Sequence, residues 1–436
     1  MGSSPQSYGL SETQAPPPAG PEDGPSLERA ESIHSYEGRD LYPYDSTSGQ
    51  NELIAPGPIA LEEHGRYLED SGARPATSDD EKAEPPAAAV KVHRGMGDIA
   101  ETLLWLVPFS IFGVLARLGM TALDTFPGSP TSGLPWVQFV GCVIMGALSE
   151  TKDFFAVRHP RPLFGSNPLM QLYVGMTTGF CGSFTTFSSW MRTILLAMAN
   201  VPASADTERP RGYSVLALLN TTILTLALSV SGIKFGAHAG LWVRSLFYQY
   251  RAHGDREARA SVKEKIKAEQ AVSGLRAAVP IGLQLAALVL GVGVWIGAVL
   301  MAVFETQWRG VALFATVFSP LGTLTRWLLS RYLNPLKPSF PLGTFAANML
   351  GTLLLGLFAI GQQRVSGTSC QVLQGLIDGY CGCLTTVSTF GLELVTLKRK
   401  HAWRYGGTSV VVGIVIMVLT LGVDNWGFHA YVKPTC

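Results

Sequence analysis

Charged residues are scarce in this sequence. They make up 15% of its 436 residues, whereas a soluble domain usually has about 25%. The net charge is only +1, and no basic run of the kind that binds nucleic acid occurs. Hydrophobic residues make up 47%, and the few charges are segregated into tails and loops. The composition therefore excludes an ordinary soluble domain and indicates a membrane protein with several spans.

The sequence also lacks the patterns of an enzyme or of a disulfide scaffold. We find no His/Glu zinc pair, no Ser/His constellation on adjacent apolar segments and no phosphate-binding loop. Four of the six cysteines lie in apolar segments, and we interpret Cys381 and Cys383 as packing residues because Ser183 replaces one of them in a related segment. A bond between Cys370 and Cys436 is permitted if both lie on one side of the membrane. We expect no enzyme.

One segment occurs twice. Residues 175–190 read GMTTGFCGSFTTFSSW, and residues 375–390 read GLIDGYCGCLTTVSTF. Small residues and hydroxyls in an apolar segment let helices approach closely, or let the backbone leave the helical path beside a cavity. An internal repeat that carries such a segment is typical of a transport site. Seven of the sixteen aligned positions are identical: Gly175/Gly375, Gly179/Gly379, Cys181/Cys381, Gly182/Gly382, Thr185/Thr385, Thr186/Thr386 and Ser188/Ser388.

Apolar stretches long enough to span a bilayer follow a disordered tail. Residues 1–97 are rich in Pro, Gly, Ser and acidic residues, show no sustained periodicity and lack the pattern of a signal peptide. We expect the third and eighth of the apolar stretches to be broken or tilted because of their length. The nine expected spans are 102–123, 134–150, 168–199, 212–233, 279–304, 310–332, 342–361, 370–397 and 406–427.

These spans predict an all-α polytopic protein with two related four-span repeats. Further matches between the repeats are Gly113-x-x-x-Arg117 with Gly322-x-x-x-Arg326, and Gly141 and Gly146 with Gly351 and Gly356. The predicted units are a disordered tail (1–97), a first repeat (98–233), a charged linker (234–278), an extra transmembrane helix (279–305) and a second repeat (306–436). Within the linker, a charged stretch has the composition of a solvated helix.

Loop charges predict the orientation of the spans. The linker carries many Lys and Arg residues and is expected in the cytoplasm. Alternation of spans then places the N-terminus inside and the C-terminus outside. The extra span inverts the second repeat relative to the first. Arg209 and Arg211 fall on the outer side and count against this orientation. We expect the protein in the plasma membrane.

A few polar residues lie inside the expected spans. Asn348 aligns with Gln138, and an amide there could donate to an anion or bond a neighbouring helix. Arg117 and Arg326 could attract an anion into a vestibule or tether helices. Each reading stays open on the sequence alone.

Aromatic residues follow the repeated Thr-Thr pair in both copies. Phe187 and Trp190 share one helix face, as do Val387 and Phe390. Such pairs are most often core packing, although the positive ring edge can also contact an anion.

The ordered motifs resemble those of the Fluc/FEX fluoride channels, in particular the fused two-repeat form. The resemblance covers about residues 100–430. It implies passive fluoride export through a narrow pore, a central sodium ion held by backbone carbonyls, and function as a monomer in the lipid bilayer. The implied sodium ligands are Gly182, Thr185, Gly382 and Thr385. The implied pore residues are Asn348, Gln138, Phe187, Trp190, Val387, Phe390, Ser188, Ser189, Ser388 and Thr389.

Three positions depart from the family pattern. Gln138 replaces an Asn, Trp190 replaces a Phe, and Val387 replaces a Phe. We therefore expect one competent pore that depends on Asn348. The alternative function is an anion/proton antiporter with inverted repeats, for which Asp378 and Glu393 are the candidate carboxylates.

Overall fold

The computed structural model describes residues 96–124, 133–156, 167–199, 212–257 and 262–427. Side chains of residues 96–98 and 251–280 are not described. Within these ranges the secondary structure is helical, with no strand. Some of the residues discussed above lie outside the described ranges. They are nearly all of the expected tail, Arg209, Arg211 and Cys436. Cys370 is disulfide-bonded, while the other four described cysteines are free.

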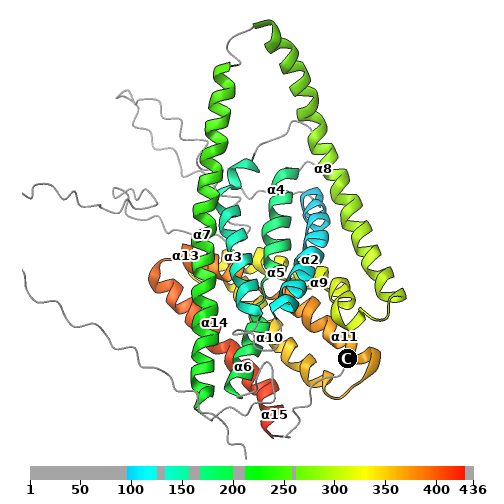
Figure 1. The fold of residues 1–436 in the computed structure, drawn as a ribbon, viewed down its shortest axis with the longest axis vertical. Helices are drawn as coiled ribbons and strands as arrows, with labels where there is room; N and C mark the ends of the chain where they lie inside the picture. Colours follow the sequence, from blue (N-terminus) through cyan, green and yellow to red (C-terminus); the bar gives the residue numbers. More distant parts are fainter. Residues whose placement is uncertain (1–95, 125–132, 157–166, 200–211, 258–261, 428–436) are drawn as a thin grey trace, which may run out of the picture. The chain divides into compact units, whose positions relative to one another are not determined.

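Figure 1 shows the helices in the order in which they follow one another along the chain. The first repeat contains α2 (Met96–Asp124), α3 (Leu134–Glu150), η1 (Lys152–Phe154), α4 (Pro168–Val174), η2 (Gly175–Cys181), α5 (Gly182–Phe184), α6 (Phe187–Met198) and α7 (Tyr213–Glu257). Helix α8 (Val262–Phe304) follows. The second repeat contains η4 (Arg309–Leu313), α9 (Phe314–Leu333), η5 (Asn334–Leu336), α10 (Leu342–Gln362), α11 (Gly367–Gly375), η6 (Leu376–Cys381), α12 (Gly382–Leu384), α13 (Ser388–Thr396), α14 (Arg399–Met417), η7 (Val418–Gly422) and α15 (Val423–Gly427).

In the part of the chain that the structure describes, six helical segments are long and apolar enough to cross a membrane, in agreement with the expected membrane protein. A shorter apolar helix, Leu134–Glu150, accompanies them. The expected spans at 168–199 and 370–397 are broken, as their length predicted. The six segments are Ile99–Asp124, Tyr213–Tyr250, Ile281–Phe304, Arg309–Leu336, Leu342–Gln362 and Arg399–Trp426.

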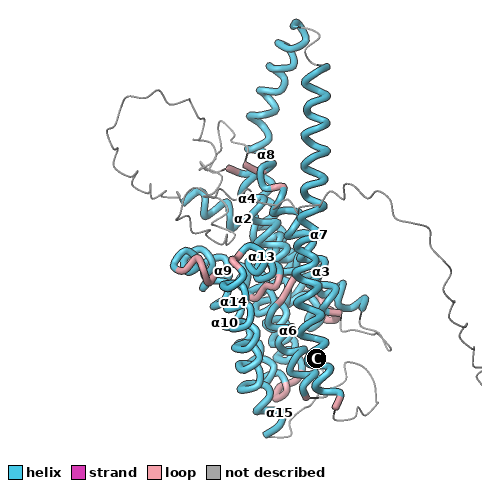
Figure 2. Tube along the Cα trace, turned by 90° about the vertical axis from the view of Figure 1, so that its left-hand side faces the viewer, coloured by secondary structure: helices cyan, strands magenta, loops and turns pink. Residues whose placement is uncertain are grey.

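Helices α7 and α8 extend well beyond the expected membrane spans. We expected one span to end at residue 233 and the next to begin at 279, but these helices have 45 and 43 residues. A bilayer core needs only about 20 helical residues. Both helices reach beyond the others at one end (Figures 1 and 2). The expected spans therefore make up only part of each helix. The rest includes most of the charged stretch that was expected to form a solvated helix, because it contains strong helix formers.

The two repeats interlock through the helices that follow the breaks. Helix α3 packs along α7, and α10 packs against α14. Helix α6 of the first repeat packs against α10 and α14 of the second, while α13 of the second packs against α3 and α7 of the first. Each half-helix after a break is therefore held by helices of the other repeat, which brings the two copies of the repeated segment together.

Candidate functional site

The repeated segment contains a break in each repeat. In the first, the helix stops at Phe184 and restarts at Phe187, because Thr185 (φ −91°, ψ 154°) and Thr186 (φ −148°, ψ 124°) are extended. In the second, Thr385 is extended in the same way (φ −96°, ψ 151°). An extended residue cannot continue the helical hydrogen bonds, so backbone groups at each break need other partners.

The two intramembrane amides supply some of those partners. Asn348 Oδ1 accepts a hydrogen bond from Thr386 N–H at 2.9 Å, and its Nδ2 donates to the Thr386 carbonyl at 3.2 Å. Gln138 makes the same two bonds with Thr186, at 3.3 and 2.7 Å. Both amides are fully buried. Each NH2 group carries two hydrogens, and only one of them is used in these bonds. The amides can therefore bond a neighbouring helix and still donate to an anion.

A consequence concerns the carbonyls just before each break. In an unbroken helix, Gly182 would accept from the N–H of Thr186, and Thr185 from that of Ser189. Here the Thr186 N–H bonds Gln138 Oε1, and the Ser189 N–H bonds Thr186 Oγ1 at 3.4 Å. The second repeat matches this pattern, with Thr389 N–H bonding Thr386 Oγ1 at 3.4 Å. These N–H groups therefore donate to side chains instead of to the helical carbonyls, so the carbonyls lose their usual donors.

Hydroxyl groups join the two breaks to each other. Thr185 Oγ1 accepts from the N–H groups of Val387 and Ser388 at 3.2 and 3.0 Å. In the opposite direction, Thr385 Oγ1 accepts from the N–H groups of Phe187 and Ser188, both at 3.1 Å. Each threonine therefore satisfies donors at the start of the other repeat's half-helix, as a helix cap does.

The paired serines reinforce this junction. Ser388 Oγ donates to the Cys181 carbonyl at 3.0 Å, and Ser188 Oγ approaches the Cys381 carbonyl at 3.5 Å. These two hydroxyls, predicted to line a pore, are thus engaged between the repeats. Thr389 differs, because its buried Oγ1 has no hydrogen-bond partner among the described residues.

The two buried arginines also cross between the repeats. Arg326 donates from Nε to the Cys383 carbonyl at 2.9 Å and from Nη2 to the Thr178 carbonyl at 2.7 Å. Arg117 donates to the Ser183 carbonyl at 3.0 Å and to the Asp378 carbonyl. Each guanidinium therefore bridges one carbonyl of its own repeat and one of the other. A delocalised charge with several donors suits this task.

Two glycines make room for the arginines. A Cβ atom added to Gly182 would overlap the guanidinium of Arg326, and one added to Gly382 would overlap that of Arg117. The repeated Cys-Gly dipeptide thus has a steric reason, since any side chain there would displace a buried charge.

The aromatic residues form one contact across the repeats. The rings of Phe187 and Phe390 have centroids 5.6 Å apart at an interplanar angle of 70°. Phe390 lies 5.3 Å from the ring of Tyr405. Trp190 turns toward its own repeat, where its Nε1 donates to the Thr221 carbonyl at 3.2 Å. Val387 is buried but supplies no ring.

A buried polar group beside Phe390 includes residues that sequence reasoning missed. Thr344 and Tyr405 donate to the two carboxylate oxygens of Glu393, each at 2.6 Å. Glu393 was considered only as a carboxylate for an antiporter. Thr344 lies four residues before Asn348, on the same helix face, and that spacing could have revealed it. No comparable signal marks Tyr405.

The polar group is confined to the second repeat. At the same alignment, Leu134 stands where the second repeat has Thr344, and Thr193 stands where it has Glu393. The phenylalanine pair therefore lies next to a hydroxyl-rich, acidic environment on the side of the second repeat.

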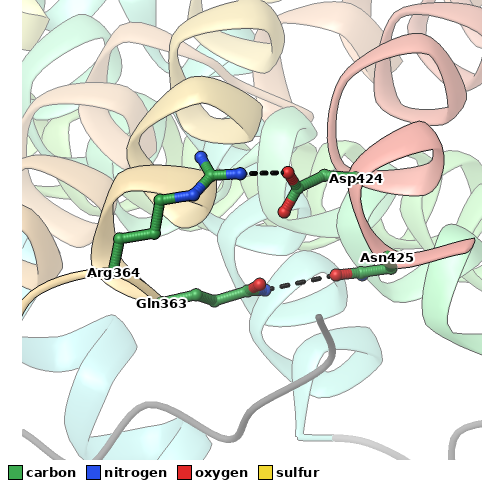
Figure 3. A network of polar contacts seen from close by, with 4 residues as sticks. All are labelled: Gln363, Arg364, Asp424 and Asn425. Carbon is green, nitrogen blue, oxygen red and sulfur yellow. Dashed lines mark hydrogen bonds and ion pairs between the residues drawn. The ribbon is translucent and has the colours of Figure 1, made fainter. Parts of the chain in front are cut away.

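A second polar network lies away from this group, at the end of α10 (Figure 3). Arg364 forms an ion pair with Asp424, and Gln363 Nε2 donates to Asn425 Oδ1 at 3.3 Å. These bonds tie the end of α10 to α15. The sequence analysis did not anticipate this network.

Comparison with known proteins gives the family. The model of the family described as CrcB-like protein, Camphor Resistance (CrcB), matches residues 104–233 and 313–423. No solved structure matches the chain.

Curated relatives include fungal and bacterial proteins. Fluoride export protein 1 of Neurospora crassa is 38% identical over 400 residues, covering 80% of this chain and 72% of the relative. Fluoride export protein 1 of Schizosaccharomyces pombe is 36% identical over 330 residues, covering 74% and 96%. Fluoride-specific ion channel FluC of Acinetobacter baumannii is 38% identical over 97 residues, covering 22% and 76%. The chain belongs to the CrcB-like family, and both of its repeats match it.

Proposed function

We propose that this chain is a fluoride channel that lets cytoplasmic fluoride leave the cell by passive electrodiffusion and so gives fluoride resistance. The names of its fungal and bacterial relatives support this function. The observation that carries the proposal is the edge-on contact of Phe187 and Phe390 from different repeats, next to buried hydrogen-bond donors. We assign no catalytic residue to the chain.

Fluoride must lose its tightly held water to enter a narrow pore. Oriented donors and positive ring edges can replace that water, while the width excludes larger halides. We assign the replacement to the second N–H of Asn348, the hydroxyl of Thr389 and the ring edges of Phe187 and Phe390. A negative-inside membrane potential favours exit of the anion.

One pore is competent in this proposal. It contains Asn348, Phe187, Phe390 and Thr389, and the group around Glu393 lies beside it. The related positions on the other side are Gln138, Trp190, Val387 and Ser189, where the ring pair and the carboxylate are both missing from the aligned sequence. Ser188 and Ser388 mainly connect the two repeats, because their hydroxyls lie against carbonyls of the other repeat. Any part they play in lining a pore is in addition to that contact.

The architecture that we propose has nine spans. Two inverted four-span repeats (98–233 and 306–436) are joined by a charged cytoplasmic linker and an extra transmembrane helix, and a cytoplasmic tail (1–97) precedes them. The crossed bonds of the two breaks support a pseudo-twofold relation between the repeats. The N-terminus is cytoplasmic, the C-terminus is extracellular, and the protein acts as a monomer in the plasma membrane.

A central sodium ion fits the chemistry of the breaks. The carbonyls of Gly182 and Thr185, and likewise those of Gly382 and Thr385, lose their helical donors to side chains. Carbonyl oxygens suit a hard cation, and a broken helix makes them available. We infer that these four carbonyls hold the ion, which would supply positive charge at the junction of the repeats.

An anion/proton antiporter is the second candidate. The observation that favours it is Glu393, a fully buried carboxylate that accepts hydrogen bonds from Thr344 and Tyr405. An antiporter would need a proton gradient to drive anion accumulation, whereas a channel needs only an electrochemical gradient of fluoride.

Fluoride efflux from proteoliposomes tests the function. Liposomes loaded with fluoride and made permeable to potassium should release fluoride without a pH gradient, and chloride-loaded liposomes should release almost nothing. Equal release of the two halides would contradict the channel. Release that appears only with a pH gradient would favour the antiporter.

A further inference from the structure

A basic patch marks the start of α14. It consists of Lys398, Arg399, Lys400 and Arg404, all exposed, together with Trp403, whose exposed fraction is 76%. Arg399 and Trp403 are four residues apart, as are Lys400 and Arg404, so each pair shares a face of the helix. The patch therefore combines cations with an aromatic ring at one helix end.

The local electrostatics of the patch are unfavourable without an anion. Like charges four residues apart repel each other. Cations at the first turn of a helix also oppose its dipole, and this first turn contains no acidic residue. These repulsions lower the stability of the first turn of α14, and an anion bound to the patch would reduce them.

The rest of the second repeat does not supply that anion. Residues 306–436 contain ten Lys and Arg residues but only three acidic ones. Asp424 pairs with Arg364, Glu393 is held by two hydroxyl groups, and Asp378 accepts from Gln374 Nε2 at 2.5 Å. Among the described residues, no ion pair involves a cation of the patch.

The position of the patch identifies the kind of anion. Helix α14 begins Arg399–Trp426, a segment long and apolar enough to cross a membrane, so we expect its charged first turn at the depth of the headgroups. Tryptophan is enriched at that depth because its ring is apolar and its N–H is polar. Basic clusters next to a span attract anionic lipids. The preference of cytoplasmic loops for Lys and Arg could explain the cations of the patch. It does not explain why the ring of Trp403 is exposed beside them.

We propose that the basic patch binds the headgroups of anionic phospholipids. Lys and Arg side chains would contact the phosphate, and Trp403 would lie against the upper acyl chains. The acidic tail is another anion within the chain, since residues 1–97 carry 17 acidic and 7 basic residues. A lipid is favoured because it offers both a phosphate and an apolar surface to the exposed ring.

Quenching of Trp403 by brominated lipids tests the proposal. The full chain is placed in nanodiscs of phosphatidylcholine that contain either brominated phosphatidylglycerol or brominated phosphatidylcholine at the same mole fraction. The chain has nine tryptophans, so the signal of Trp403 is the difference between the wild type and Trp403→Phe. We expect apparent binding of the anionic lipid to be stronger on the order of tenfold, and 1 M salt to weaken it.

Two sets of variants test whether the cations of the patch cause the preference for anionic lipid. K398Q/R399Q/K400Q/R404Q should abolish the preference, whereas R209Q/R211Q, which removes cations elsewhere, should keep it. Equal quenching by both lipids would overturn the proposal. So would a preference that appears only after deletion of residues 1–97, because the tail would then occupy the patch in the full chain. If the fourfold variant does not fold, the salt dependence in the wild type still decides the question.

Discussion

Asn348 exchanges two hydrogen bonds with the backbone of Thr386, one in each direction. The amide assigned to the pore thereby occupies the N–H group that an unbroken helix would direct to the Gly382 carbonyl. The fluoride pore and the proposed sodium site consequently depend on the same side chain.

Sodium should stabilise the folded protein, and Asn348→Ala should weaken that effect. Without the amide, the Thr386 N–H competes with sodium for the Gly382 carbonyl. We expect replacement of sodium by a large organic cation to lower the melting temperature in detergent, because a ligand of the native state stabilises it. The drop should be smaller in Asn348→Ala than in Gln363→Ala, a control that alters an amide at the end of α10. Equal drops in melting temperature for the two variants would contradict the dependence of the sodium site on Asn348.

Arg326→Lys should destabilise the protein by about 2 kcal/mol, because an ammonium group cannot reproduce the fork that bridges Cys383 and Thr178. Arg331→Lys is the control, since Arg331 lies over the Trp327 ring, with Cζ 5.1 Å from the ring centroid, and is less buried. Its effect should stay below about 0.5 kcal/mol. Denaturant unfolding in micelles measures both, and similar losses would argue against the bridging role.

Gly382→Ala should be strongly destabilising. Its Cβ would overlap the guanidinium of Arg117, and overpacking of a dense interior typically costs about 1–3 kcal/mol. At Gly407 no atom lies within 4 Å of an added Cβ, so Gly407→Ala should leave stability unchanged or raise it by up to about 1 kcal/mol. Thermal unfolding compares the two, and the account fails at this point if Gly382→Ala is as stable as the wild type.

Thr185→Val should loosen the junction between the repeats. It removes the oxygen that accepts from Val387 and Ser388, which resembles loss of a helix cap and should cost about 1–2 kcal/mol. Ser245→Ala is the control, because that hydroxyl is exposed and bonds only the Trp242 carbonyl in its own helix, α7. Hydrogen exchange at the start of α13 should rise only in Thr185→Val. A rise in both variants, or in neither, would speak against the capping role.

Patterns carried by apolar length and by repetition were predictable from the sequence. The repeated segment predicted two related breaks, and the length of the third and eighth apolar stretches predicted that they would be interrupted. Both features depend on local composition, which a single sequence displays directly.

Contacts between distant residues were not predictable in the same way. Glu393 and Tyr405 belong to different helices, and only the turn between α13 and α14 brings the hydroxyl to the carboxylate. The crossing of Arg117 to the Asp378 carbonyl depends on how the repeats interlock. At α7 and α8 the helices continue past the expected spans into the charged stretch whose composition predicted a helix, because the change from apolar to charged residues does not mark the end of a helix.

A direct comparison of the two amides tests the central claim, which is that fluoride passes through one pore built around Asn348. Fluoride efflux from proteoliposomes is measured for Asn348→Ala and Gln138→Ala, each normalised to the amount of folded protein because both amides hold a break. The account predicts near-complete loss of efflux for Asn348→Ala and retention of most efflux for Gln138→Ala. Equal losses in the two variants would contradict it.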